Sequence, residues 1–227
     1  MTRDTMSDYT DILKTTNYVA NRWVEDGDGT LEVLDKYHGT TLASLPLATS
    51  AHVEDAITAA QAGFAELQRW SAGQRAERLE RLAALLDAHR DAFVDLIVKE
   101  AGKPIAYARN EIDRCLITIR TAAAEALRFT GETVPIDFAA GEGKTAFTKR
   151  FPIGIVTCIT PFNFPLNLVL HKIAPALAVG CSVIVKPAPQ APLVTLALAG
   201  LMEQLDYPPG TFNALICSNP VAETLVT

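Results

Sequence analysis

Apolar residues in the middle of the chain recur every three or four positions, which is the spacing of one buried face of an α-helix. The first such stretch follows Ser50, and its apolar face consists of Val53, Ile57, Ala60, Phe64 and Leu67. The same spacing predicts three further helices, over Ser71–Ala88, Asp91–Ala101 and Pro104–Thr130. We therefore expect a largely helical segment between residues 50 and 130.

After Arg150 the pattern changes to short, continuous apolar runs rich in β-branched residues, which are typical of strands buried on both faces. Helical spacing separates the runs, and a last helix is predicted to begin near Asn219 and to continue to the end of the chain. Strand–helix–strand units form parallel sheets with right-handed crossovers. The predicted strands are Phe151–Ile159, Ser182–Val185 and Phe212–Cys217, and the predicted helices are Pro165–Gly180 and Pro192–Leu205.

The remaining segments predict less regular structure. Residues 18–47 are expected to form short strands joined by turns, and residues 1–17 a loosely ordered leader. Thr133–Ala140 and Lys144–Arg150 flank Gly141-Glu142-Gly143, which is typical of a β-hairpin. The same glycines could open a phosphate-binding loop, but the third glycine of that motif is missing. The hairpin is the favoured interpretation.

Composition narrows the class of protein. The 227 residues are 49% hydrophobic and 20% charged, as in ordinary soluble globular proteins. A formal net charge of −6 argues against a nucleic-acid partner, which requires a basic surface. No apolar run is long enough for a membrane span, and the N-terminus lacks the basic and apolar regions of a signal peptide. We therefore expect a cytoplasmic protein with no nucleic-acid and no membrane partner.

The cysteines show no pattern of metal binding or redox chemistry. The four cysteines form no CxxC pair and have no metal-ligand spacing with the four histidines. Their positions favour reduced, buried thiols that act as small hydrophobic side chains. We therefore predict no metal site, and we expect this structural role for Cys115, Cys158, Cys181 and Cys217.

Candidate chemistry follows the ends of two predicted strands. The polar loop Thr160–Pro165 follows the first strand, and Lys186 ends the second. Ligands of open parallel sheets bind beyond the carboxyl ends of the strands. The Asn163 amide could donate a hydrogen bond to a developing oxyanion, or it could satisfy backbone groups of its own loop. Lys186 could bind a ligand, or it could extend along the sheet edge into solvent.

Three motifs carry a resemblance to a known family. They are TPFNFP at Thr160–Pro165, KPAPQAPL at Lys186–Leu193 and PPGTFNAL at Pro208–Leu215. With these motifs the chain resembles the N-terminal, cofactor-binding portion of the aldehyde dehydrogenase superfamily, from about Tyr18 to its end. The resemblance implies an α/β fold: a Rossmann-like parallel sheet with flanking helices, an N-terminal helical segment and a protruding β-hairpin.

The resemblance also implies a division of the chain. After the leader, residues 18–132 would form the strands and helices of the cofactor-binding half, and residues 133–150 a hairpin that joins subunits. Residues 151–227 would form a Rossmann-like NAD(P)-binding core that is incomplete at its C-terminus. The full-length relative would be a homodimer or homotetramer.

Roles for single residues follow from the matched motifs. Asn163 matches the amide that holds the substrate carbonyl oxygen, and Lys172 a lysine that helps with proton relay. His171 falls at the substrate tunnel, where it would suit a polar or anionic aldehyde, although a helix histidine bonded to neighbouring backbone is an alternative. The matched cofactor-binding positions are Ile159, Thr160, Pro161, Phe162, Lys186, Ala188, Pro189, Ser218 and Asn219.

Two of these positions depart from the family pattern and bear on the choice between NADP and NAD. Many members carry Glu where this chain has Pro189, and that carboxylate would bind the ribose hydroxyls and repel a 2′-phosphate. Asn219 stands at a usual Gly position, and Ser218 could bond a phosphate or cap a helix. Lys186 remains beside the ribose, so we expect NADP to be accepted at least as well as NAD.

The activity that the resemblance implies is NAD(P)-dependent oxidation of a small aldehyde to a carboxylic acid through a cysteine thiohemiacetal. The family's nucleophilic cysteine and general-base glutamate lie beyond Thr227. We therefore expect the 227-residue chain to be inactive alone. The alternative is a naturally shortened, non-catalytic protein that binds a nucleotide or a partner.

Overall fold

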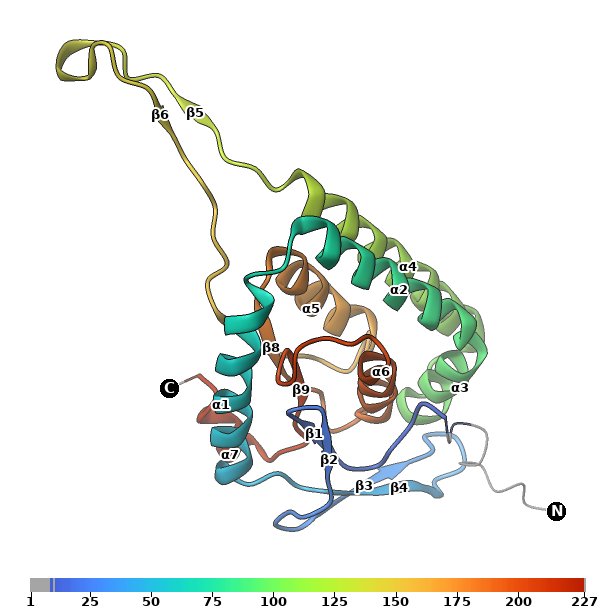
Figure 1. Ribbon diagram of the computed structural model, residues 1–227. Helices are drawn as coiled ribbons and strands as arrows, with labels where there is room; N and C mark the ends of the chain where they lie inside the picture. The colour runs from blue at the N-terminus through green and yellow to red at the C-terminus, as the bar shows by residue number, and fades with distance from the viewer. Residues whose placement is uncertain (1–8, 10, 227) are drawn as a thin grey trace.

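A five-stranded mixed sheet forms the centre of the protein, in the order β2-β1-β9-β8-β7. A computed structural model describes residue 9 and residues 11–226 (Figure 1). The strands β7, β8 and β9 are parallel neighbours, whereas β1 pairs antiparallel with both β9 and β2. The bounds are Asn17–Val19 for β1, Arg22–Val24 for β2, Ile155–Ile159 for β7, Ser182–Lys186 for β8 and Phe212–Ala214 for β9.

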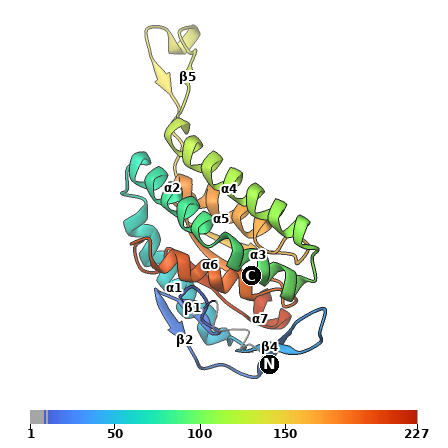
Figure 2. The same cartoon turned by 90° about the vertical axis from the view of Figure 1, so that its right-hand side faces the viewer.

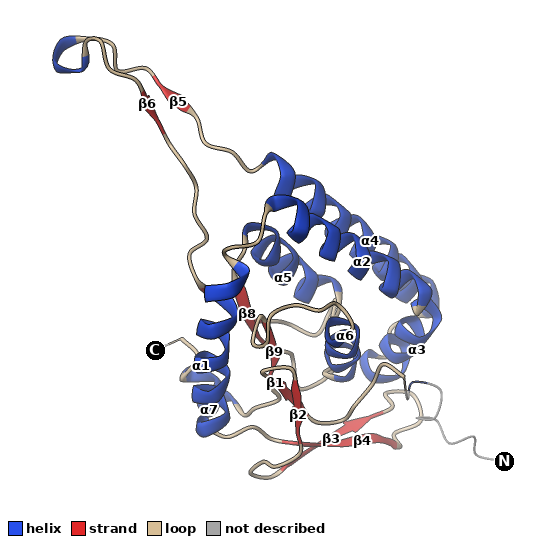
Figure 3. Cartoon of the chain, viewed as in Figure 1, coloured by secondary structure: helices blue, strands red, loops and turns tan. Residues whose placement is uncertain are grey.

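Helices cover both faces of this sheet. The helices α5 and α6 pack on one face and α1 packs on the other, while α2, α3 and α4 form an outer layer over α5 and α6 (Figures 1 and 2). A separate antiparallel pair, β3 and β4, lies near the N-terminal end of α1 (Figure 3). The bounds are Thr30–Leu34 for β3, Thr41–Pro46 for β4, Ser50–Leu67 for α1, Ala72–Ala88 for α2, Arg90–Ala101 for α3, Ile105–Arg128 for α4, Asn167–Val179 for α5, Leu193–Glu203 for α6 and Asn219–Glu223 for α7.

The elements agree with the α/β fold expected from the sequence. All the predicted helices are present, and the strand β8 is buried along its whole length. The parallel strands β7, β8 and β9 alternate with α5 and α6, as the apolar pattern predicts, although β1 and β2 make the complete sheet mixed. No helix among the described residues is both long and apolar enough to cross a bilayer.

The first strand of the core differs from the prediction. The strand β7 begins at Ile155, and Phe151 and Ile153 before it are 70% and 87% exposed. It is an edge strand and only part of it is buried, so the prediction of burial on both faces is wrong for β7. Apolar periodicity reports the character of a strand, but not whether another strand lies beside it.

The C-terminal boundaries also differ. The strand β9 ends at Ala214, and Cys217 forms only an isolated bridge with Ala48. The last helix ends at Glu223 and gives way to a turn, so its predicted continuation is wrong for the described residues. The apolar run continues beyond Ala214 because Leu215, Ile216 and Cys217 remain buried although they lie outside the strand β9.

The predicted hairpin is present and projects from the body of the protein (Figure 1). Its paired strands are short, β5 at Thr133–Val134 and β6 at Ala146–Phe147, and a 3₁₀ turn at Ala139–Gly141 forms the tip. Pro135, directly after β5, has no amide N–H to continue the ladder. The glycines therefore belong to a hairpin tip, not to a phosphate loop that opens a helix.

The expected leader is in part well packed. Tyr9, Ile12 and Leu13 are buried, so the expectation of a loose segment is wrong for them, and residues 1–8 and 10 lie outside the described residues. Ile12 lies against Gly200 of α6, where an added Cβ would come within 2.0 Å of the Ile12 carbonyl oxygen. Glycine at this position allows the N-terminal segment to approach the α6 backbone.

Two buried glutamates cap helices that have no cap of their own. Neither α5 nor α6 has a side-chain bond at its N-cap residue, and the acceptors come from the outer helical layer. Glu111 accepts hydrogen bonds from the amides of Leu166 (3.0 Å) and Asn167 (3.1 Å). Glu100 accepts from the amides of Leu193 (2.7 Å) and Val194 (2.8 Å). Both glutamates are 0% exposed, so these amides are satisfied without water.

The Glu100 cap predicts a pH-dependent stability. Burial raises the pKa of the Glu100 carboxyl from an ordinary 4.5 to about 8, against the lowering by the Val194 and Leu193 amides and by the charge of Lys36. The folded state therefore keeps this proton to higher pH than the unfolded state. The contribution of Glu100 to stability is present below pH 4.5 and is lost as pH rises through 8.

We expect the free energy of unfolding to fall by up to about 1.4 kcal/mol per pH unit across this window. The Glu100→Gln variant should show a flatter profile, because the side chain no longer titrates. Urea unfolding at a series of pH values measures both, and Glu54→Gln on the exposed surface of α1 is the matched control. Equal pH slopes in wild type and Glu100→Gln would contradict this assignment.

Candidate functional site

The loop after β7 and the end of β8 lie side by side at the carboxyl edge of the sheet. The pairing register places Ile159 directly opposite Lys186, and the Thr160 amide donates a hydrogen bond of 3.2 Å to the Lys186 carbonyl oxygen. Thr160 is buried, whereas Pro161, Phe162 and Asn163 are exposed. The parallel arrangement thus brings together the two sequence-predicted segments that carry candidate chemistry.

The Asn163 side chain is available to a ligand. Its amide makes no hydrogen bond to any residue in the described part of the chain, so the alternative in which it satisfies its own loop does not hold. The backbone on either side of Asn163 is held instead. Thr160 is bonded to β8, and the Glu111 carboxylate binds the Leu166 and Asn167 amides.

Lys186 is buried at the end of β8 and is only 5% exposed. Within residues 11–226 its ammonium has neither a hydrogen bond nor an ion pair, although its charge lowers the pKa of Cys217, which burial raises. The ammonium nitrogen is not among the buried atoms that lack a partner, so it reaches the surface at this edge, where a ligand hydroxyl or phosphate could accept from it. The stem of Lys186 is therefore buried while its charged end remains accessible at the sheet edge.

The other proposed cofactor positions lie near the same edge. Ala188 is buried and Pro189 is exposed. Because position 189 is a proline, no carboxylate lies three residues after Lys186. Ser218 occupies the N-cap position of α7 but makes no capping hydrogen bond, and it lines a cavity of about 360 Å³. Asn219 follows in the helix without a positive φ, so this turn does not require glycine.

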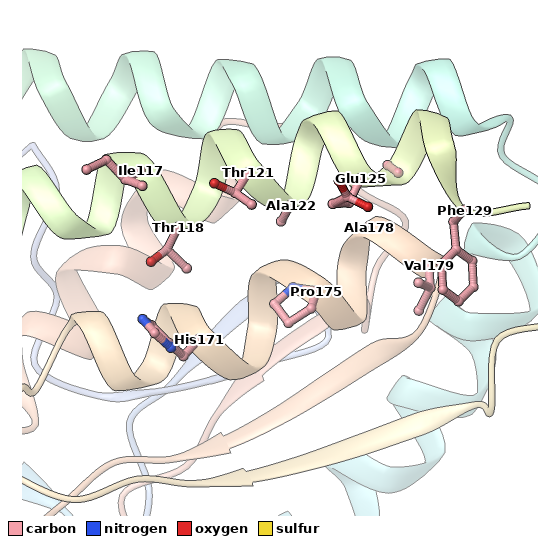
Figure 4. Close-up of a pocket in the computed structure, with 11 residues that line it drawn as sticks. Ile117, Thr118, Thr121, Ala122, Glu125, Phe129, His171, Pro175, Ala178 and Val179 are labelled. Atoms are coloured by element: carbon pink, nitrogen blue, oxygen red, sulfur yellow. The ribbon is translucent and has the colours of Figure 1, made fainter.

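His171 and Lys172 leave α5 in different directions. His171 lines an apolar groove of about 470 Å³ between α4 and α5, opposite Thr118, and it makes no hydrogen bond to a described residue (Figure 4). The alternative of a backbone-bonded histidine therefore does not hold. Lys172 borders a different hollow with Phe151, and it makes no hydrogen bond to Asn163.

The sequence did not predict that three charged residues, Lys103, Glu111 and Arg114, lie near the Asn163 loop. Lys103 and Arg114 lie 4.0 and 5.1 Å from the ring centre of Phe164, the residue after Asn163, and Lys103 also pairs with Glu111. One signal was present in the sequence. Glu111 interrupts the apolar face of the long helix, where a charge is unusual unless it has a buried partner. The neighbouring residues on that face are Ala108, Ile112 and Cys115.

The cysteines of the described chain are unsuited to nucleophilic catalysis. All four are free and buried, as the sequence predicted. Burial raises the pKa of Cys158 to about 11, despite the charge of Lys172, and raises that of Cys115 well above its usual value. Thiolate is the reactive form, and burial suppresses it here. The described residues contain no group of His, Cys, Asp and Glu side chains that could hold a metal ion.

Comparison with known proteins places these features in one family. The sequence matches the family model "Aldehyde dehydrogenase family" over residues 23–227. It is 39% identical over 199 residues to the 3-sulfolactaldehyde dehydrogenase of Priestia aryabhattai, covering 87% of this chain and 41% of that protein. The chain thus spans about two fifths of the length of this curated relative.

Solved structures agree with this assignment. The crystal structure of aldehyde dehydrogenase 21 from Physcomitrella patens with its reaction product succinate superposes with a TM-score of 0.88 at 37% identity, over 93% of this chain and 44% of that one. An NADP-dependent enzyme of E. coli superposes with a TM-score of 0.88 at 31% identity, over 93% of this chain and 44% of that one. The fold and the motifs at the carboxyl edge of its sheet show that this chain belongs to the aldehyde dehydrogenase family.

Proposed function

We propose that this chain is the N-terminal, cofactor-binding portion of a cytoplasmic enzyme that oxidises a small aldehyde to a carboxylic acid with NADP or NAD. The observation that carries the proposal is the pairing of two features at one sheet edge. The unbonded amide of Asn163 lies on the loop after β7, and the accessible, unpaired ammonium of Lys186 lies at the end of the neighbouring parallel strand β8.

Each side chain has a defined role in this proposal. The Asn163 amide donates to the oxygen of the substrate carbonyl as negative charge develops on it. Lys186 donates to the adenine-side ribose, and the backbone of Ile159, Thr160, Pro161 and Phe162 lies along the nicotinamide end. NADP or NAD, when bound, accepts the hydride that leaves the substrate carbon. Lys172 assists proton relay once the remainder of the active site is assembled.

The substrate class follows from the charge and polarity around the loop. His171 faces the groove from α5, and the exposed Arg114 lies 5.1 Å from the ring centre of Phe164, whereas the charge of Lys103 is compensated by Glu111. These groups favour a small polar or anionic aldehyde. The relatives agree with this choice, because one is named for 3-sulfolactaldehyde and another was crystallised with the product succinate.

The hairpin supports assembly of the full-length protein as a homodimer or homotetramer. It projects away from the body, and its side chains Phe138 and Phe147 are 69% and 76% exposed. Apolar side chains on a projecting ribbon are suited to a second subunit. In this proposal residues 133–150 join subunits, while residues 18–132 and 151–227 bind the cofactor.

The 227-residue chain alone should not oxidise aldehydes. Its thiols are buried, and none is placed as a nucleophile. We expect no reduction of NADP or NAD with any aldehyde, and no rapid labelling of the four thiols by DTNB until urea is added. Steady cofactor reduction that disappears in a single Cys→Ser variant would contradict the proposal and assign a nucleophile within this chain.

In the full-length protein, Asn163→Ala should lower kcat by about 10²–10³, because one preorganised oxyanion donor is lost. The KM for the cofactor should change little, since Lys186 and the backbone are untouched. The assay compares wild type and variant with succinate semialdehyde and with butanal, of which the anionic aldehyde should have the higher kcat/KM. A fall in kcat of less than about threefold would remove Asn163 from its proposed role.

NADP should be used at least as well as NAD by the full-length protein. Pro189 places no negative charge near the 2′-phosphate, and Lys186 attracts it. Pro189→Glu should shift selectivity toward NAD, because the carboxylate accepts from the ribose hydroxyls and repels the phosphate. Measured kcat/KM values for both cofactors decide the matter. A preference of wild type for NAD above about tenfold, roughly 1.4 kcal/mol, would be the opposite result.

A further inference from the structure

We propose that Glu111 is a positioning residue that holds the Asn163 loop in the geometry its oxyanion role requires. The proposal rests on the function proposed above for Asn163. It arises from a contrast within the loop, because the side chain of Asn163 makes no bond to the described protein while the backbone on both sides of it is fixed.

Glu111 fixes the C-terminal side of the loop. Its carboxylate reaches from α4 and binds the amides of Leu166 and Asn167, where α5 begins. On the same two helices, the Thr118 hydroxyl donates to the Asn167 side-chain oxygen at 3.3 Å. The first turn of α5 therefore cannot shift along α4 without breaking hydrogen bonds of the buried Glu111 and Asn167.

The second oxygen of Glu111 extends this control to the residue next to Asn163. It pairs with the Lys103 ammonium, which lies 4.0 Å from the ring centre of Phe164. Arg114 lies 5.1 Å from the same ring. Cations at such distances attract an aromatic face, so two cations contact the Phe164 ring, and Glu111 holds one of them, Lys103, by an ion pair.

Small displacements at this loop should have large kinetic effects. An oxyanion donor is effective only within a few tenths of an ångström of its ideal distance, and a misplacement of about 1 Å can cost about 10²-fold in rate. Because Asn163 has no side-chain anchor of its own, its position follows its backbone. Glu111 thus acts on the reaction through Asn163 and does not touch the substrate.

The chain contains a matched control for this proposal. Glu100 has the same side chain and the same capping role as Glu111: it is 0% exposed, lies in the outer helical layer and caps α6 through two amides. The helix α6 does not carry the Asn163 loop. Loss of either carboxylate should destabilise the fold, but only loss of Glu111 should impair the oxyanion donor.

The test uses the full-length enzyme with saturating NADP and succinate semialdehyde. Glu111→Ala should lower kcat about ten- to hundredfold with the KM for NADP within about threefold of wild type. Glu111→Gln should recover part of the loss, because its carbonyl oxygen still accepts from the two amides. Glu100→Ala should leave kcat within about threefold. If Glu111→Ala does not fold, the comparison of Glu111→Gln with Glu100→Gln takes its place.

A double-mutant cycle separates positioning from general damage. If Glu111 acts through Asn163, adding Glu111→Ala to Asn163→Ala should change kcat by less than about threefold. Hydrogen exchange of the 227-residue chain gives a reading that does not depend on activity. The amides of residues 164–170 should exchange faster in Glu111→Ala and not in Glu100→Ala.

Three results would overturn the inference and leave the proposed function intact. One is an active enzyme in which Glu111→Ala leaves kcat within about threefold, and another is an equal loss of kcat in the Asn163→Ala background. The third is unchanged exchange over residues 164–170. If the wild-type enzyme does not oxidise aldehydes, the proposed function and this inference both fail. That outcome differs from the first result, in which the wild-type enzyme is active and Glu111→Ala is equally active.

Discussion

The architecture depends on two helix N-termini that are satisfied from another layer. The helices α5 and α6 connect the parallel strands, and each begins with backbone amides that no local side chain accepts. Glu111 and Glu100 supply the acceptors from positions 55 to 94 residues earlier in the chain. A buried amide without a partner costs as much as a lost hydrogen bond, so the outer helices must dock on the sheet layer in one register.

Glu111 and Glu100 differ in the groups that compensate the burial of their carboxyl groups. Glu111 is paired with Lys103 and bonded to two amides, so its charge is compensated on both oxygens. Glu100 has amide partners but no ion pair with a described residue, and burial raises its pKa to about 8. A buried charge with full partners adds little net stability compared with an apolar residue. Its contribution here is to select one arrangement of layers.

Sequence patterns predicted the elements better than they predicted the contacts between layers. Helical periodicity and capping signals act over a few residues, so α1 to α6 follow from them. The juxtaposition of Asn163 and Lys186 was also accessible, because carboxyl ends of neighbouring parallel strands share one edge. The exposure of β7 and the caps at Glu100 and Glu111 were not accessible, since they depend on which elements are neighbours in space.

The same two caps connect the halves of the candidate site. Glu111 holds the helix that follows the Asn163 loop, and Glu100 holds the helix that follows the Lys186 loop. Both glutamates belong to consecutive helices, α3 and α4, which pack on each other and on α2 or α6. The outer helices therefore contact the two segments through separate carboxylates, so that Glu111 acts on the Asn163 loop and Glu100 on the helix after Lys186.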